Sequence, residues 1–144
     1  AEIMDAVPDA TIGGTFCGNA LACASALTII DIMEKEDFAG KAVTMAEKLH
    51  KHFDAWKEKY EVVGDVRGTG CMMGIEFVTS KETKEPATKL VGDIVQYAAH
   101  HGLVLEAAGT YSNVIRCLAP LVMTDEQLEA GCAILEEAIV ACSK

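Results

Sequence analysis

The segment of this chain that is best suited to bind a ligand is residues 13–22, GGTFCGNALA. It places flexible backbone and one hydroxyl, that of Thr15, directly before a long apolar run. Glycines let backbone N–H groups approach a ligand closely, and a helix that begins near Gly18 or Asn19 presents unpaired donors and the positive end of its dipole. The pattern predicts a phosphate-binding turn. The alternative is an ordinary helix entry without a ligand.

Two arginines stand apart from the ten lysines, which are mostly scattered among acids along polar helix faces. Arg67 lies between Val66 and Gly68, and Arg116 follows an apolar stretch, Asn113-Val114-Ile115. A guanidinium is a planar fork that matches a carboxylate, so we expect any specific anion to be bound by one of these two residues. For Arg116, the alternative is a strand arginine paired with a carboxylate of the same chain.

The cysteines and histidines do not predict a metal site. The six cysteines lack a C-x-x-C pair or a spacing typical of zinc. We interpret them as small buried hydrophobic residues of a protein in the reducing cytoplasm, and not as disulfides or metal ligands. The four histidines are interpreted as surface or helix-end residues.

Composition excludes several classes of partner. The formal net charge of −10 argues against binding to nucleic acid or to an anionic membrane surface, because both need a concentrated cationic face. No stretch is long and apolar enough to cross a bilayer. The length of 144 residues is enough for a domain with its own core. The first eight residues form no obvious complete element, so we expect the chain to open inside a longer protein.

The elements that must position these residues follow from the hydrophobic pattern. We predict helices over 20–34, 38–60 and 87–101, the last stopped by Gly102. Strands are predicted on both sides of a glycine turn within 61–78, and over 103–106 and 113–118. Thr124 and Gln127 form a capping-box pattern that opens a final helix. This order predicts an α+β two-layer sandwich, in which a small, largely antiparallel sheet has helices on one face.

Three motifs in this order resemble the class III aminotransferases, which use pyridoxal phosphate, and especially the 4-aminobutyrate aminotransferases. The motifs are Glu2–Ala6 followed by Gly13–Asn19, the glycine hairpin Arg67–Glu76, and Gly109–Arg116 with Pro120 and Leu121. The family usually has proline where this chain has Ala20, a change that the same helical geometry tolerates.

The resemblance implies roles for particular residues. Thr15, with its neighbours Gly14 and Phe16, would contact the cofactor phosphate in the active site of a partner subunit, which implies a homodimer. Arg116 would bind the α-carboxylate of an amino or 2-oxo acid. Arg67 has no ligand role in this comparison, and we interpret it as an anchor of the hairpin. Residues 1–36 would lead from a large domain through an interface helix, and residues 37–144 would form the C-terminal small domain of a fold-type I transferase.

The resemblance also implies that essential residues are missing. The lysine that holds the cofactor as a Schiff base lies farther upstream of Thr15 than this chain reaches, so we expect no catalytic residue here and no activity of the chain alone. The predicted function is the C-terminal portion of an enzyme that moves an amino group from an ω-amino acid such as 4-aminobutyrate to 2-oxoglutarate. The alternatives are an amino-acid racemase or epimerase of the same family, and an independent small-molecule-binding α+β module.

Overall fold

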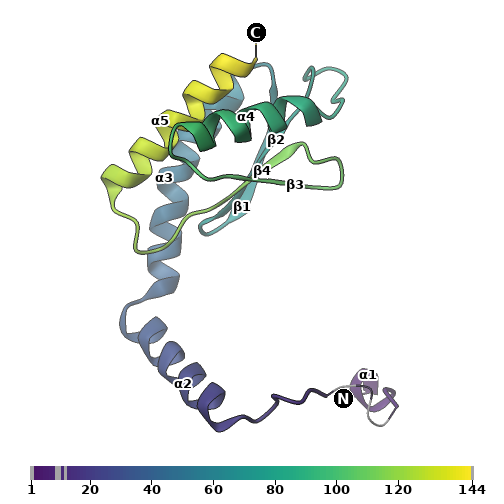
Figure 1. The fold of residues 1–144 in the computed structure, drawn as a ribbon, viewed down its shortest axis with the longest axis vertical. Helices are drawn as coiled ribbons and strands as arrows, with labels where there is room; N and C mark the ends of the chain where they lie inside the picture. Colours follow the sequence, from purple (N-terminus) through teal and green to yellow (C-terminus); the bar gives the residue numbers. More distant parts are fainter. Residues whose placement is uncertain (1, 9–10, 12, 144) are drawn as a thin grey trace. The chain divides into compact units, whose positions relative to one another are not determined.

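The computed structural model of the chain describes residues 2–8, 11 and 13–143 (Figure 1). Residues 1, 9, 10, 12 and 144 lie outside the described residues. By its internal contacts the chain divides into two compact units, Ala1–Asp37 and Phe38–Lys144. Each unit is therefore described by itself.

The first unit contains a single-turn helix, α1 (Glu2–Asp5), and a long helix, α2 (Ala20–Lys35). The side chain of Asn19 caps α2 by accepting a hydrogen bond from the backbone N–H of Ala22 at 3.0 Å. The predicted helix is thus confirmed, with a defined start. None of its residues is buried, so the apolar side chains of α2 remain exposed in this chain.

The second unit is built on a four-stranded sheet with the order β1-β2-β4-β3. The strands are β1 (Val63–Thr69), β2 (Met72–Phe77), β3 (Glu106–Ala108) and β4 (Val114–Leu118). Every neighbouring pair is antiparallel. Gly70 turns β1 into β2 with φ of +57°, a left-handed conformation that glycine adopts without strain.

The core of this unit lies between one face of the sheet and the helices α3 (Phe38–Lys59), α4 (Thr88–His100) and α5 (Asp125–Cys142) (Figure 1). Successive residues of a strand point to opposite faces, and the burial follows that period. Met73 and Ile75 are buried, whereas Met72 is 53% exposed. The α+β class with an antiparallel sheet is therefore confirmed, and the helices of this unit pack on the face that carries Met73 and Ile75.

One strand begins later than predicted. The segment 103–106 was expected to be a strand, but β3 starts at Glu106. Gly102 adopts φ of +90° and ends α4 as predicted, and the N–H of Leu103 then donates to the carbonyl of Ala98 at 2.9 Å. Because this amide closes the helix end, the chain joins the sheet only three residues later.

The capping box at the start of α5 is present with both of its hydrogen bonds. The N–H of Gln127 donates to the Thr124 hydroxyl at 3.3 Å, and the Gln127 side-chain carbonyl accepts from the N–H of Thr124 at 3.0 Å. Of the helices that the structure describes, none is long and apolar enough to span a bilayer.

A substitution on the buried face of α3 tests this packing directly. We expect Leu49→Ala to lower the free energy of unfolding by roughly 2–5 kcal/mol, because it removes a buried side chain and leaves a cavity. Leu49 is 1% exposed, whereas Val43 on the same helix is 58% exposed. The matched control, Val43→Ala, should change the value by at most about 0.5 kcal/mol. Urea unfolding followed by circular dichroism measures both, and equal losses would contradict the assigned core.

Candidate functional site

The predicted phosphate-binding turn is an exposed, tightly bonded loop ahead of α2. The N–H of Cys17 donates to the carbonyl of Gly14 at 3.0 Å, and the N–H of Asn19 donates to that of Phe16 at 3.1 Å. Gly18 has φ of +74°. Thr15 and Phe16 are exposed, and among the described residues the Thr15 hydroxyl has no hydrogen-bond partner.

Space is tight beside one glycine of this turn. A Cβ atom added at Gly14 would lie 3.2 Å from the sulfur of Cys17, which is closer than ordinary van der Waals contact. A side chain at this position would require the Cys17 side chain to shift. The Thr15 hydroxyl lies on an exposed residue before the first N–H groups of α2. Such donors suit the phosphate of pyridoxal phosphate. The described residues thus fit one part of that cofactor.

Arg116 lies on β4 and pairs with a carboxylate of the same chain. Its Nη2 atom donates to Oε2 of Glu106, which stands directly opposite on β3. The Arg116 side chain is 45% exposed and that of Glu106 is 66% exposed. The alternative foreseen for a strand arginine, a pair with a carboxylate of the same chain, is therefore present in the structure. Ion pairs this exposed contribute about 0–1 kcal/mol, so a ligand carboxylate can replace Glu106 at small cost.

A pocket of about 560 Å³ adjoins this pair within the second unit. Its walls come from the end of β4, the loop after it, the first half of α5 and the segment before β3. Most of the lining is apolar, including Leu118, Met123 and Leu135, and Arg116 and Glu106 are among its polar members. The ion pair of Arg116 with Glu106 therefore lies at the edge of an apolar pocket.

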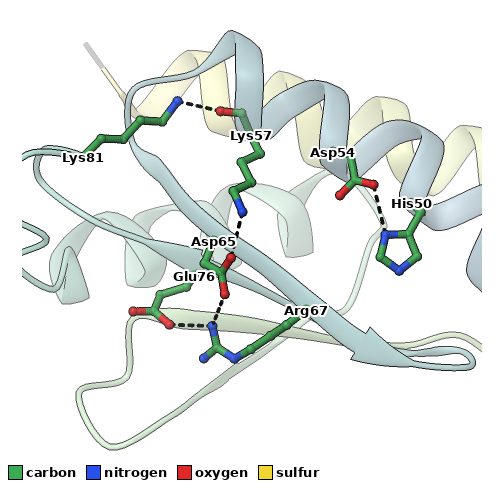
Figure 2. Close-up of polar contacts among 7 residues, drawn as sticks. All are labelled: His50, Asp54, Lys57, Asp65, Arg67, Glu76 and Lys81. Atoms are coloured by element: carbon green, nitrogen blue, oxygen red, sulfur yellow. Dashed lines mark hydrogen bonds and ion pairs between the residues drawn. The ribbon is translucent and has the colours of Figure 1, made fainter.

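Arg67, the second arginine, is held within a chain of ion pairs (Figure 2). Its Nη1 atom lies 2.6 Å from Glu76 on β2 and 3.1 Å from Asp65 on its own strand. Asp65 also accepts from Nζ of Lys57 on α3 at 2.8 Å. The cross-strand pair with Glu76 supports the interpretation of Arg67 as an anchor of the hairpin.

The electrostatics of this cluster favour the charged forms of Asp65, Arg67 and Lys57. Hydrogen bonding from Lys57 and then from Arg67 holds the pKa of the Asp65 carboxyl below its ordinary value. The bond to Glu76 is the main cause of a raised pKa of Arg67. These pKa shifts are typical of ion pairs that stabilise a hairpin, because each of them moves the group's pKa farther from neutral pH.

The lysines with a shifted pKa do not resemble the lysine of a covalent catalyst. The pKa values of Lys57, Lys59 and Lys89 are raised, chiefly by hydrogen bonds to Asp65, Glu136 and Asp93 respectively. A nucleophilic lysine needs the opposite shift, because only the neutral amine attacks a carbonyl. These three lysines therefore act as surface cations.

The interpretation of the cysteines holds only in part. Cys132 is buried, and burial raises the pKa of its thiol to about 12. Cys17 and Cys23 are exposed, contrary to expectation, because they lie in the turn and in α2, where no residue is buried. Within the described residues, no group of three or more histidine, cysteine or acidic side chains could hold a metal ion.

Sequence reasoning missed Glu106, the partner of Arg116. The residue was placed at the end of a strand whose register was unknown, so its position opposite Arg116 could not be inferred. Asp65 and Lys57 were missed for a similar reason, because their contact joins a strand to a helix. Glu76 was part of the hairpin motif, but its spacing from Arg67 does not reveal the cross-strand pair.

Comparisons with known proteins place this chain in a family. The model of the family described as aminotransferase class-III matches residues 1–139. The chain is 43% identical over 137 residues to a 5-aminovalerate aminotransferase of Pseudomonas aeruginosa and 39% identical over 137 residues to a 4-aminobutyrate aminotransferase of Escherichia coli. Each match covers 95% of this chain and 32% of the relative. The chain therefore spans about a third of the length of these relatives.

Two further relatives show the range of the family. A leucine/methionine racemase of Thermococcus litoralis is 37% identical over 139 residues, or 96% of this chain and 31% of the relative. The solved structure of an amine transaminase from an uncultivated Pseudomonas species, in its pyridoxal phosphate-bound form, superposes with a TM-score of 0.81 at 32% identity. That match covers 93% of this chain and 30% of the other.

The α+β fold with its antiparallel sheet and the family match together define the class of this chain, which is similar to a transaminase of known structure in its pyridoxal phosphate-bound form. More particularly, the chain belongs to the class III aminotransferase family.

The Asp65 cluster gives a pH-dependent prediction. Because the folded-state pKa of Asp65 is depressed, its stabilising effect is present above the ordinary value of 3.8 and is lost as the pH falls through the lower folded value. We expect Asp65→Asn to lower the free energy of unfolding at pH 7 by at most about 1 kcal/mol, since these pairs are partly screened by solvent.

This difference from the wild type should close as the pH falls below 3.8. Urea unfolding at a series of pH values between neutral and acid measures it. The control is Glu47→Gln on α3, because the described residues provide no ion-pair partner for Glu47. A difference for Asp65→Asn that is independent of pH would contradict the assigned cluster.

Proposed function

We propose that this chain is the C-terminal portion of an aminotransferase that moves an amino group from an ω-amino acid, such as 4-aminobutyrate or 5-aminovalerate, to 2-oxoglutarate. The observation that carries the proposal is the match of the class III family over residues 1–139, with relatives named for these two substrates at about 40% identity. In this proposal the activity belongs to the complete protein, because the chain spans only about a third of the length of its relatives. We expect the isolated chain to be inactive.

In this proposal, the turn before α2 contacts the cofactor. Thr15 is flanked by Gly14 and Phe16. Its hydroxyl donates a hydrogen bond to the phosphate of pyridoxal phosphate that is bound to a partner subunit. When bound, pyridoxal phosphate supplies an electron sink for the transfer of the amino group. The exposed hydroxyl of Thr15 and its place before the N-terminus of α2 support this role.

Arg116 binds the α-carboxylate of the amino or 2-oxo acid. Its guanidinium is half exposed and held only by an exposed carboxylate within the described residues, so it can exchange that partner for a substrate. A planar guanidinium binds a carboxylate through two parallel hydrogen bonds, which also orients the substrate.

We further propose that residues 1–36 connect a large domain to the small domain formed by residues 37–144, and that α2 is part of a homodimer interface. Leu21, Leu27 and Ile29 on α2 are all more than half exposed. Exposed apolar surface of this kind is typical of a face that another chain or domain covers. The proposed location is the cytoplasm, which suits the unpaired cysteines.

A racemase or epimerase is the second candidate, favoured by the 37% identity to a leucine/methionine racemase. The two activities differ in their need for an acceptor. An aminotransferase needs a 2-oxo acid to accept the amino group, whereas a racemase interconverts enantiomers without any oxo acid.

The test uses the complete protein loaded with pyridoxal phosphate. We expect 4-aminobutyrate or 5-aminovalerate to shift the absorbance of the cofactor, and 2-oxoglutarate to reverse the shift. A protein that gives no shift with either donor, yet converts L-leucine to its enantiomer without an oxo acid, is a racemase. The isolated chain of 144 residues serves as the comparison, and we expect it to give neither reaction.

The role of Thr15 yields a separate prediction. We expect Thr15→Ala in the complete protein to weaken binding of pyridoxal phosphate by about 10- to 100-fold, because a hydrogen bond to a charged group contributes about 1.5–3 kcal/mol. Thr15→Ser keeps the hydroxyl and should bind nearly as tightly as the wild type. Titration of the cofactor-free protein, followed by absorbance, measures both. Equal affinities of the two variants would contradict the proposed hydrogen bond from the Thr15 hydroxyl to the phosphate.

A further inference from the structure

Among the residues that the structure describes, Asn113 is the one buried residue with a polar or charged side chain. It lies directly before β4, is 4% exposed, and is followed by the buried apolar residues Val114 and Ile115. Burial of an amide costs free energy unless its hydrogen-bonding groups find partners. The buried amide therefore favours the one placement of β4 in which those partners are present.

The partner of Asn113 is Phe77, the last residue of β2. The N–H of Phe77 donates to the carbonyl of Asn113 at 2.7 Å, and the side-chain Nδ2 of Asn113 donates to the carbonyl of Phe77 at 3.0 Å. The same carbonyl of Phe77 also accepts from the N–H of Ala87, directly before α4, at 3.1 Å. One side chain thus joins the start of β4 to the end of β2 and to the entry of α4.

These bonds continue the register that places Arg116. Phe77 with Asn113 is the next pair after the last pair of β2 with β4. Ile115 is fully buried against the helices, so Arg116, the next residue, projects from the opposite face of the sheet. A shift of β4 by one residue would separate the Asn113 amide from Phe77 and would turn Arg116 toward the core.

The hairpin formed by β3 and β4 is also held at its turn. β3 has three residues and lies at the edge of the sheet, so β4 pairs with β2 over more residues than with β3 (Figure 1). In the turn, the N–H of Ser112 donates to the carbonyl of Gly109 at 3.0 Å, and the hydroxyl of Thr88, the first residue of α4, donates to the carbonyl of Tyr111. Asn113 follows this turn directly, so its bonds fix β4 at the end where the strand begins.

From these contacts we infer that Asn113 is a positioning residue for Arg116. Its side-chain amide fixes the register of β4 three residues before the guanidinium. The inference rests on the proposed function of Arg116 as the carboxylate-binding residue. Because Asn113 is buried, it acts through Arg116 and not on the substrate. It holds the donor atoms of Arg116 where a carboxylate can accept two hydrogen bonds at once.

The test is a calorimetric titration of glutarate, an unreactive dicarboxylate, into the complete protein loaded with pyridoxal phosphate. Asn113→Asp keeps the shape of the side chain, but its carboxylate has no hydrogen to donate to Phe77. We expect it to weaken glutarate binding by about three- to tenfold, because a bidentate ion pair needs both donors of the guanidinium in place. Asn113→Ala removes the amide and leaves the Phe77 carbonyl bonded to the N–H of Ala87, so it should fold and show a similar loss.

The matched control is Ile139→Val on α5, which removes one buried methyl group and leaves the hydrogen bonds of β4 unchanged. Its affinity for glutarate should stay at the wild-type value. In the enzyme assay, both Asn113 variants should raise KM for 2-oxoglutarate. A loss of folded protein alone would lower the apparent kcat and leave KM unchanged.

Arg116→Lys separates the failure of this inference from that of the proposed function. If Arg116→Lys weakens glutarate binding but both Asn113 variants bind as the wild type does, the positioning by Asn113 is wrong and the role of Arg116 stands. If Arg116→Lys leaves the affinity unchanged, Arg116 is not the carboxylate site, and both the assignment and the inference fail. A loss of affinity in Ile139→Val equal to that in the Asn113 variants would also overturn the inference, because it would reflect the general stability of the unit.

Discussion

The antiparallel pairing of β2 with its two neighbours is the constraint on which the second unit depends. Because side chains alternate between faces along a strand, one register decides both which side chains are buried and which lie on the opposite face. Met73, Ile75 and Phe77 enter the core, and Met72, Gly74 and Glu76 face the other way. A shift of β2 by one residue would exchange these sets, exposing the core and burying charge.

Gly74 lies in β2, the strand that pairs with both of these neighbours. It lies between Arg67 and Arg116 across neighbouring strands, and a Cβ atom there would come within 3.3 Å of a methyl group of Val114. The absence of a side chain at Gly74 therefore has two effects. It permits close packing on its own face of the sheet, and it keeps a side chain out of the row between the two guanidinium groups.

The two arginines illustrate how the same residue type takes different roles within one sheet. Arg67 is fixed by carboxylates on its own strand and on the next, which makes it part of the hairpin. Among the described residues, Arg116 is held by one carboxylate, that of Glu106 on the short edge strand β3. The number and placement of the neighbouring carboxylates, and not the guanidinium itself, distinguish these two arginines.

Much of the fold followed from local patterns alone. The hydrophobic period marked α2, α3, α4 and α5, Gly102 ended a helix, and Thr124 with Gln127 formed the capping box, because each of these signals acts within a few residues of sequence. The family and the chemistry of Thr15 and Arg116 were likewise suggested by motifs in their linear order. The start of β3 was misplaced, because the helix end at Leu103 holds the chain away from the sheet. Only the tertiary structure decided that Glu106 faces Arg116 and that Asp65 joins Lys57 to Arg67. Strand register and helix-to-strand contacts join residues distant in sequence, and local propensity does not encode those distances.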